Sequence, residues 1–179
     1  MPIEIDVRDL VARPGSSRTV PVAERVPGLA TELARVPEDR VLAAGLLLES
    51  VVEGVLVSGP VEGVMVLRCA RCLKAFDSDF RLDIQELFSP GETDDEYPLT
   101  DGFVDVEPMI RDAVMLAMPF APLCRPECLG LCERCGGDRN LGECACPPEA
   151  DARWSALLEF KIDESDEPPS RVRREGSGM

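Results

Sequence analysis

The residues best suited to chemistry in this sequence are its cysteines. Cys69 and Cys72 form a Cys-x-x-Cys pair, and six more cysteines crowd into the segment 124–146. In a cytosolic protein, cysteines are expected to be thiols or metal thiolates because cytosolic reductants keep structural disulfides rare. Four thiolates make a closed tetrahedral shell for structural zinc. The eight cysteines therefore predict two four-cysteine zinc sites with no ligand left over.

The spacing of the cysteines predicts how they divide. Two short-range pairs can complete one tetrahedron when the chain turns tightly around the ion. The last four cysteines make such a self-contained site, and the two that remain in the same segment need partners from far away in the sequence. The predicted sets are Cys132, Cys135, Cys144 and Cys146 for a local site, and Cys69, Cys72, Cys124 and Cys128 for a site that joins distant segments. Other pairings, or one zinc with four spare thiols, are alternatives.

Other uses of these cysteines make different demands on the sequence. A thioredoxin-type dithiol requires its Cys-x-x-Cys at the start of a helix, whereas Cys69 follows one strand pattern and leads into another. A catalytic zinc needs an open fourth position, which a closed tetrathiolate site does not offer. An iron–sulfur cluster also takes four cysteines, and spacing alone does not separate it from zinc. A redox protein with reactive thiols is the alternative functional class.

Composition excludes several classes of function. The 179 residues contain no histidine, which removes Ser-His-Asp and Cys-His catalysis and histidine metal ligands. The formal charge of −15 argues against a basic coat for nucleic acid. There is neither a cationic leader followed by an apolar stretch nor an apolar run of membrane-spanning length. We expect a cytoplasmic protein with neither a membrane association nor a small-molecule substrate.

Strand patterns dominate the first ninety residues. Strict alternation predicts a half-buried strand over 3–8, whereas 13–21 is expected to be a loop. Further strands are predicted at 41–48, 51–57, 61–67 and 76–88. Gly59-Pro60 is the expected turn between two of these strands, and the Cys69–Cys72 segment is the expected tip of a hairpin. Such short connections imply antiparallel neighbours.

Helical signals follow this strand-rich region. Residues 91–102 are acidic and read as a solvated loop, and helical spacing predicts a helix over 106–118 that ends before Pro119. A second, short helix is expected after Asp151, with Trp154 as its core anchor. The predicted class is therefore α+β: an antiparallel sheet, curled toward a barrel, covered by one or two helices, with a Cys-rich zinc module packed on a β-hairpin.

The expected domain organisation has three parts. Residues 1–120 form the antiparallel β domain with its covering helix, and 121–161 form the zinc module and the short C-terminal helix, packed on the first part as one unit. Residues 162–179 are rich in charge and proline and are expected to be a disordered tail.

Basic residues flank the cysteines even though the chain is acidic. The six candidates for contact with RNA or a protein partner are Arg68, Arg71, Lys74, Arg125, Arg134 and Arg139. Each zinc tetrathiolate centre carries a charge of −2, so these side chains could instead only balance the thiolates. The acidic excess lies mainly in 91–120 and would attract a basic protein partner.

Several further motifs occur together in this sequence. They are the segment 123–141 with Cys144-Ala-Cys146 and Asp151-Ala-Arg153, and upstream Ile5-Asp-Val-Arg-Asp-Leu10, Glu53-Gly-Val-Leu-Val57 and Cys69-Ala-Arg-Cys-Leu73. In combination they resemble the YceD family, described as large ribosomal RNA subunit accumulation protein. The resemblance extends over about residues 3–160. A generic zinc ribbon would not include the upstream hairpin, so the combination is specific.

The resemblance implies a non-enzymatic role in the accumulation of large-subunit ribosomal RNA. The implied partners are that RNA, a basic ribosomal protein or an assembly factor. Some family members lack most of the cysteines, which implies that metal stabilises this branch and is not itself the activity. A zinc-dependent interaction or regulatory module is a further alternative, but the helix over 106–118 has one arginine against two acidic residues, unlike a DNA-recognition helix.

Overall fold

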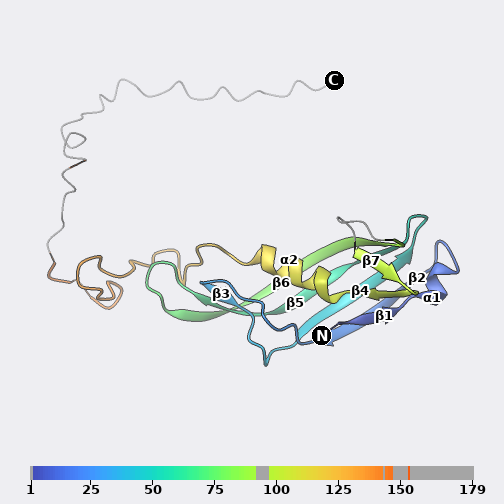
Figure 1. The fold of residues 1–179 in the computed structure, drawn as a ribbon. Coiled ribbons are helices and arrows are strands. Elements are labelled where there is room, and N and C mark those ends of the chain that lie inside the picture. The colour runs from blue at the N-terminus through green and yellow to red at the C-terminus, as the bar shows by residue number, and fades with distance from the viewer. Residues whose placement is uncertain (1, 92–96, 143, 147–152, 154–179) are drawn as a thin grey trace, which may run out of the picture. The chain divides into compact units, whose positions relative to one another are not determined.

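The structure is a computed structural model that describes residues 2–91, 97–142, 144–146 and 153 (Figure 1). Its contacts separate one compact unit, Met1–Cys144, from a second, Ala145–Met179. The helix expected after Asp151 and the tail expected over 162–179 lie outside the described residues, apart from Arg153.

The first unit is an eight-stranded sheet with two helices, which confirms the α+β class. The strands are β1 (Glu4–Asp6), β2 (Ser17–Glu24), β3 (Ala34–Arg35), β4 (Leu42–Ser50), β5 (Val55–Arg68), β6 (Ala75–Ser89), β7 (Tyr97–Thr100) and β8 (Phe103–Asp105). The helices are α1 (Arg8–Val11) and α2 (Glu107–Ala117). The sheet order is β1-β8-β7-β6-β5-β4-β2, with β3 paired to β5, and the sheet curls into a half-barrel.

The hairpin of β5 and β6 carries the Cys-x-x-Cys turn at its tip, as predicted. Its register runs from Val55 opposite Phe88 to Arg68 opposite Ala75 without a shift. Alternate side chains of β5, such as Val57 and Val61, are fully buried in the core. This period of two is what allows one face of a strand to pack while the other remains polar.

The turn predicted at Gly59-Pro60 is wrong, because β5 runs through both residues. The φ angle of Gly59 is +148°, and a Cβ there would lie 2.2 Å from the carbonyl oxygen of Gly45 on β4. Glycine is therefore needed for the close approach of two backbones and not for a reversal of the chain. Pro60 lies where the β4–β5 ladder is interrupted between the Ala44–Val61 and Leu47–Ser58 pairs, at a place where its missing N–H is tolerated.

Two loop predictions were also wrong in part. Residues 13–21 include the start of β2, which pairs with β4 from Ser17 onward. Pro21 fits this strand because β2 is the last strand of its sheet, and edge strands tolerate proline. The predicted loop 91–102 contains β7, whose pairing with β6 is parallel, contrary to the expectation of antiparallel neighbours throughout. Acidic residues are uncommon in strands, so the composition of this segment did not predict a four-residue strand.

Helix α2 lies within the range predicted for it and covers the sheet (Figure 1). Met109, Ile110 and Val114 form its buried face. Burial of each such side chain contributes about 2 kcal/mol. At the start of the helix, the Asp105 carboxylate accepts hydrogen bonds from the N–H groups of Ile3 (2.8 Å) and Glu107 (3.1 Å), and so ties β1 to the helix. No helix among the described residues is long and apolar enough to cross a membrane.

Candidate metal centres

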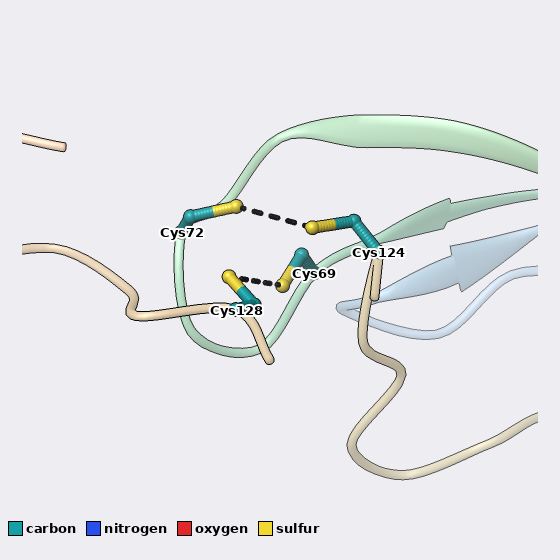
Figure 2. Close-up of side chains that lie close together, drawn as sticks. All are labelled: Cys69, Cys72, Cys124 and Cys128. Atoms are coloured by element: carbon teal, nitrogen blue, oxygen red, sulfur yellow. Dashed lines mark hydrogen bonds between the residues drawn. The ribbon is translucent and has the colours of Figure 1, made fainter. Parts of the chain in front are cut away.

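The hairpin tip and a segment that follows α2 together form the first cysteine cluster, which we call the bridging site (Figure 2). Cys69 and Cys72 come from the β5–β6 turn, and Cys124 and Cys128 come from the later segment. The sulfur atoms lie 3.8 Å apart for Cys69 and Cys128, and 3.7 Å apart for Cys72 and Cys124. Cys69 is fully buried and Cys128 is only 2% exposed. Cysteines more than fifty positions apart in the sequence thus bring their sulfur atoms into one cluster.

The spacing of these sulfurs fits a metal ion better than a disulfide. A tetrahedral zinc centre with Zn–S bonds of about 2.3 Å has S···S edges of about 3.8 Å. The two distances above match this edge, whereas a disulfide requires about 2.05 Å. All eight cysteines are free. Four converging thiols with buried surroundings are a donor set suited to a closed, structural metal site.

The second cluster, which we call the local site, contains Cys132, Cys135, Cys144 and Cys146. Its ligand sulfurs all lie within 4.8 Å of one another, as do those of the bridging site. It is more accessible, because Cys135 is exposed and the other three are partly buried. The structure therefore brings together the same two sets of four that the spacing predicts, and either set could hold a metal ion.

The two Cys-x-x-Cys turns have the same backbone hydrogen bonds. The N–H group of Leu73 donates to the carbonyl of Cys69, and that of Gly136 donates to the carbonyl of Cys132, both at 2.9 Å. The residue after the second cysteine is left-handed in each turn, with φ of +62° at Leu73 and +70° at Gly136. This conformation turns the chain so that both sulfurs of a pair point to one side. Glycine adopts it freely, whereas leucine does so at a cost of about 1–2 kcal/mol.

Backbone amides set the acidity of the first cysteine in each turn. Burial raises the pKa of the Cys69 thiol, but N–H groups of Cys124, Cys72 and Arg71 outweigh it and lower the pKa to about 6. N–H groups of Cys135 and Arg134 lower the pKa of Cys132 to about 6 as well. Such hydrogen bonds stabilise the thiolate, which is the form that binds metal.

The net shift of Cys124 is in the opposite direction: burial raises the pKa of its thiol to about 12, and the neighbouring Cys72 and Cys128 sulfurs increase it further. At these distances all four cysteines can be deprotonated only when a cation lies between their sulfurs, because thiolates repel one another. Metal binding at the bridging site would therefore release protons, above all from Cys124.

Direct hydrogen bonds also join the hairpin tip to the segment 122–131. The N–H of Ala70 donates to the Pro122 carbonyl at 2.8 Å, and the N–H of Leu131 donates to the Arg71 carbonyl at 3.0 Å. The Arg71 guanidinium donates to the Cys128 carbonyl at 2.9 Å. A Cβ on Gly130 would lie 3.1 Å from the Arg71 carbonyl oxygen, so only glycine allows this approach without displacement. The module is thus bonded to the hairpin independently of the sulfurs.

Asn140 is a functional residue of the bridging site that sequence reasoning missed. Its side-chain oxygen accepts from the N–H of Leu129 at 2.9 Å and from Arg125 at 2.7 Å. Its side-chain nitrogen donates to the Asp138 carboxylate at 2.6 Å and lies 3.5 Å from the Cys128 sulfur. The sequence alone does not indicate this role, because the distant partners of Asn140 become visible only in the fold.

We expect substitution of Asn140 to weaken metal binding at the bridging site. Asn140→Asp replaces an N–H donor with a negative oxygen beside Cys128 and Asp138, and should lower metal affinity by about 10–100-fold. Asn140→Ala is the matched control, since it removes the hydrogen bonds without adding charge and should have a smaller effect. Competition with a chromogenic chelator measures both. Equal chelator resistance in the parent and both variants would contradict this role.

The six basic residues predicted to contact a partner are all exposed near the two clusters. Two of them also make bonds within the protein, because Arg71 holds the Cys128 carbonyl and Arg125 donates to Asn140. Side-chain hydrogen bonds or ion pairs are absent for Arg68, Lys74 and Arg139 within the described part of the chain. The structure therefore separates cations that hold the module from cations that remain available.

Comparison with known proteins shows that this chain belongs to the YceD family. The family model described as "Large ribosomal RNA subunit accumulation protein YceD" matches residues 57–161. This match includes all eight cysteines, so the hairpin tip and the Cys-rich segment are within the family region.

Individual relatives include uncharacterized proteins and one that carries the family's name. An uncharacterized protein of Mycobacterium tuberculosis is 35% identical over 174 residues, which cover 92% of this chain and 84% of the relative. One from Mycobacterium leprae is 37% identical over 75% of this chain and 66% of its own. A chloroplastic YCED homolog 1 of Zea mays, named as a large ribosomal RNA subunit accumulation protein, is 36% identical over 29% of this chain and 18% of its own. No solved structure matches.

Proposed function

We propose that this protein is a non-enzymatic cytoplasmic factor that supports accumulation of large-subunit ribosomal RNA. Membership of the YceD family is the observation that carries the proposal. In this proposal two zinc ions occupy the bridging and local sites and make the hairpin tip and the Cys-rich segment one rigid platform. The platform contacts large-subunit ribosomal RNA, and a basic ribosomal protein or an assembly factor is the other partner class.

The distribution of available cations supports RNA contact at this end of the molecule. Arg68, Lys74 and Arg139 are exposed and have no side-chain hydrogen bond or ion pair among the described residues. Arg68 and Lys74 flank the Cys-x-x-Cys turn of the bridging site in the sequence. Arg139 is connected to the same region through Gly130, because the Arg139 N–H donates to the Gly130 carbonyl at 3.0 Å. A small cationic patch on an acidic protein would confine contact with phosphate groups to this end of the molecule. The rest of the acidic surface would repel RNA.

Salt-dependent binding of large-subunit ribosomal RNA fragments tests this role. The parent should bind more weakly as salt rises, and the triple variant Arg68→Gln, Lys74→Gln, Arg139→Gln should reduce the slope of log affinity against log salt by about 3. The control variant Arg13→Gln, Arg25→Gln, Arg40→Gln makes the same change in charge at exposed positions elsewhere and should leave the slope unchanged. A flat salt response in the parent would contradict phosphate contact.

Metal content and thiol reactivity distinguish this proposal from the redox alternative. The freshly purified protein should carry about two zinc ions per chain and almost no reactive thiol until a chelator is added. Little metal and several fast-reacting thiols would instead favour a cysteine-based redox protein. Iron, in place of zinc, would indicate clusters of another kind at the same ligands.

A further inference from the structure

Strand β6 has a free edge on the side opposite β5. One side of β6 pairs with β5 from Ala75 to Phe88, but on the other side β7 pairs only at Phe88 and Ser89. Among the described residues, no other strand pairs with that side. Every second residue of a strand directs its N–H and C=O groups away from a given partner. The edge that precedes Phe88 therefore presents main-chain donors and acceptors.

A groove of about 830 Å³ runs along this edge between β6 and α2. Four consecutive β6 residues, Asp83 to Glu86, line it. Consecutive residues point to opposite faces of a sheet, so a groove lined by all four follows the edge of the strand and not one face. Leu116 of α2, which is 86% exposed, contributes to the apolar part of the lining.

The described residues that line the groove include acidic side chains and no basic ones. Asp83 and Glu86 come from β6, and Asp112 comes from α2 and accepts a hydrogen bond from the Tyr97 hydroxyl at 2.9 Å. Burial raises the pKa of Tyr97 to about 12, and the Asp112 and Glu86 carboxylates add to the increase. The lining therefore has a negative potential beside main-chain groups and an exposed leucine.

Nearby cations do not neutralise this lining, because they are paired elsewhere. Arg81 pairs with Glu62, and Arg111 pairs with Glu107 at 2.5 Å and donates to the Pro27 carbonyl at 2.9 Å. A second copy of this chain is a poor occupant, since each copy has a formal charge of −15. Acidic side chains beside an open edge oppose self-pairing and favour a basic partner.

We propose that this groove binds an extended segment of a basic partner protein by adding it to the free edge of β6. The segment alternates lysine or arginine with apolar residues, so that main-chain hydrogen bonds supply affinity while the carboxylates and Leu116 select the side chains. This inference rests on the proposed function in one respect, which is that the basic partner is a ribosomal protein. The site itself is separate from the cationic patch assigned to RNA.

A short blocked peptide in which lysine alternates with valine is the probe for this site, measured by calorimetry on the full-length protein. We expect it to bind and to slow amide exchange over 83–86. Asp83→Lys with Glu86→Lys should weaken binding at least about tenfold. Glu38→Lys with Asp39→Lys makes the same charge change at an exposed turn and should leave the affinity unchanged. Equal losses in both variants would overturn the proposal in favour of general charge attraction.

Two N-methylated forms of the peptide test strand addition separately from charge. Methyl groups on the lysine amides block one edge of the peptide, and methyl groups on the valine amides block the other. One form should lose binding and the other should retain it. Equal binding of both forms, or dimerisation of the protein through β6 in sedimentation experiments with no peptide bound, would overturn the proposal. These outcomes do not depend on RNA, so failure here is distinct from failure of the ribosomal role.

Discussion

Cys72→Ser should weaken the contacts between the hairpin tip and the Cys-rich segment and reduce the metal content from two ions per chain to one. The substitution removes one of four ligands from a buried site, and the metal-binding energy of a structural site is folding energy. We expect the free energy of unfolding to fall by at least about 3 kcal/mol. Hydrogen exchange should show lost protection at 69–74 and 122–131, with protection in the β4–β5 ladder retained.

Cys135→Ser is the matched control for this prediction. It removes a ligand from the local site, where the sulfur is exposed, and should unfold the surroundings of that site while the hairpin tip remains protected. Elemental analysis should again find one metal ion per chain, but with the opposite pattern of amide protection. If the two variants lose protection in the same segments, or if Cys72→Ser matches the parent, the assignment of ligands to two sites is wrong.

Gly59→Ala should destabilise the sheet by about 3 kcal/mol. The new methyl group would overlap the carbonyl oxygen of Gly45, which belongs to the backbone of β4 and has no rotamer to change. The φ angle of +148° adds strain for any residue with a Cβ. Urea unfolding followed by circular dichroism measures the loss as a lower midpoint at an unchanged slope.

Gly45→Ala provides an unusually close control, because the two glycines approach each other across the same strand pair. A Cβ on Gly45 would meet no heavy atom within 4 Å, and its φ angle lies outside the left-handed region. We therefore expect a change within about 0.5 kcal/mol. Similar losses in both variants would show that the cost comes from the loss of glycine in a strand and not from the backbone contact.

Local patterns predicted most of the elements that position the site. The alternation of residues before and after Cys69 and Cys72 was enough to place the turn at a hairpin tip, and apolar spacing was enough to locate α2. The two sets of cysteines followed from counting ligands and from their distances along the chain. Each of these predictions depends either on residues that are close together in the sequence or on the fixed coordination number of a metal. Neither requires knowledge of the fold.

What the sequence did not predict depends on contacts between distant backbones. Gly59-Pro60 has the composition of a turn, and only the nearness of Gly45 shows that the strand continues. Pro21 has the appearance of a strand breaker until β2 is known to be an edge. The role of Asn140 depends on Leu129 and Cys128, which lie 11 and 12 positions away in the sequence and come beside it only in the fold.

The position of the bridging site along the chain has a consequence for the order of folding. Its cysteines Cys72 and Cys124 are 52 positions apart, and β6, β7, β8 and α2 are synthesised between them. Closing a loop of this length costs about 1 kcal/mol more entropy than closing the segment that carries the local site. Metal capture at the bridging site would therefore follow the synthesis of α2, because Cys124 and Cys128 come after that helix in the chain. A chain that holds an ion there would already have brought its hairpin tip and its Cys-rich segment together.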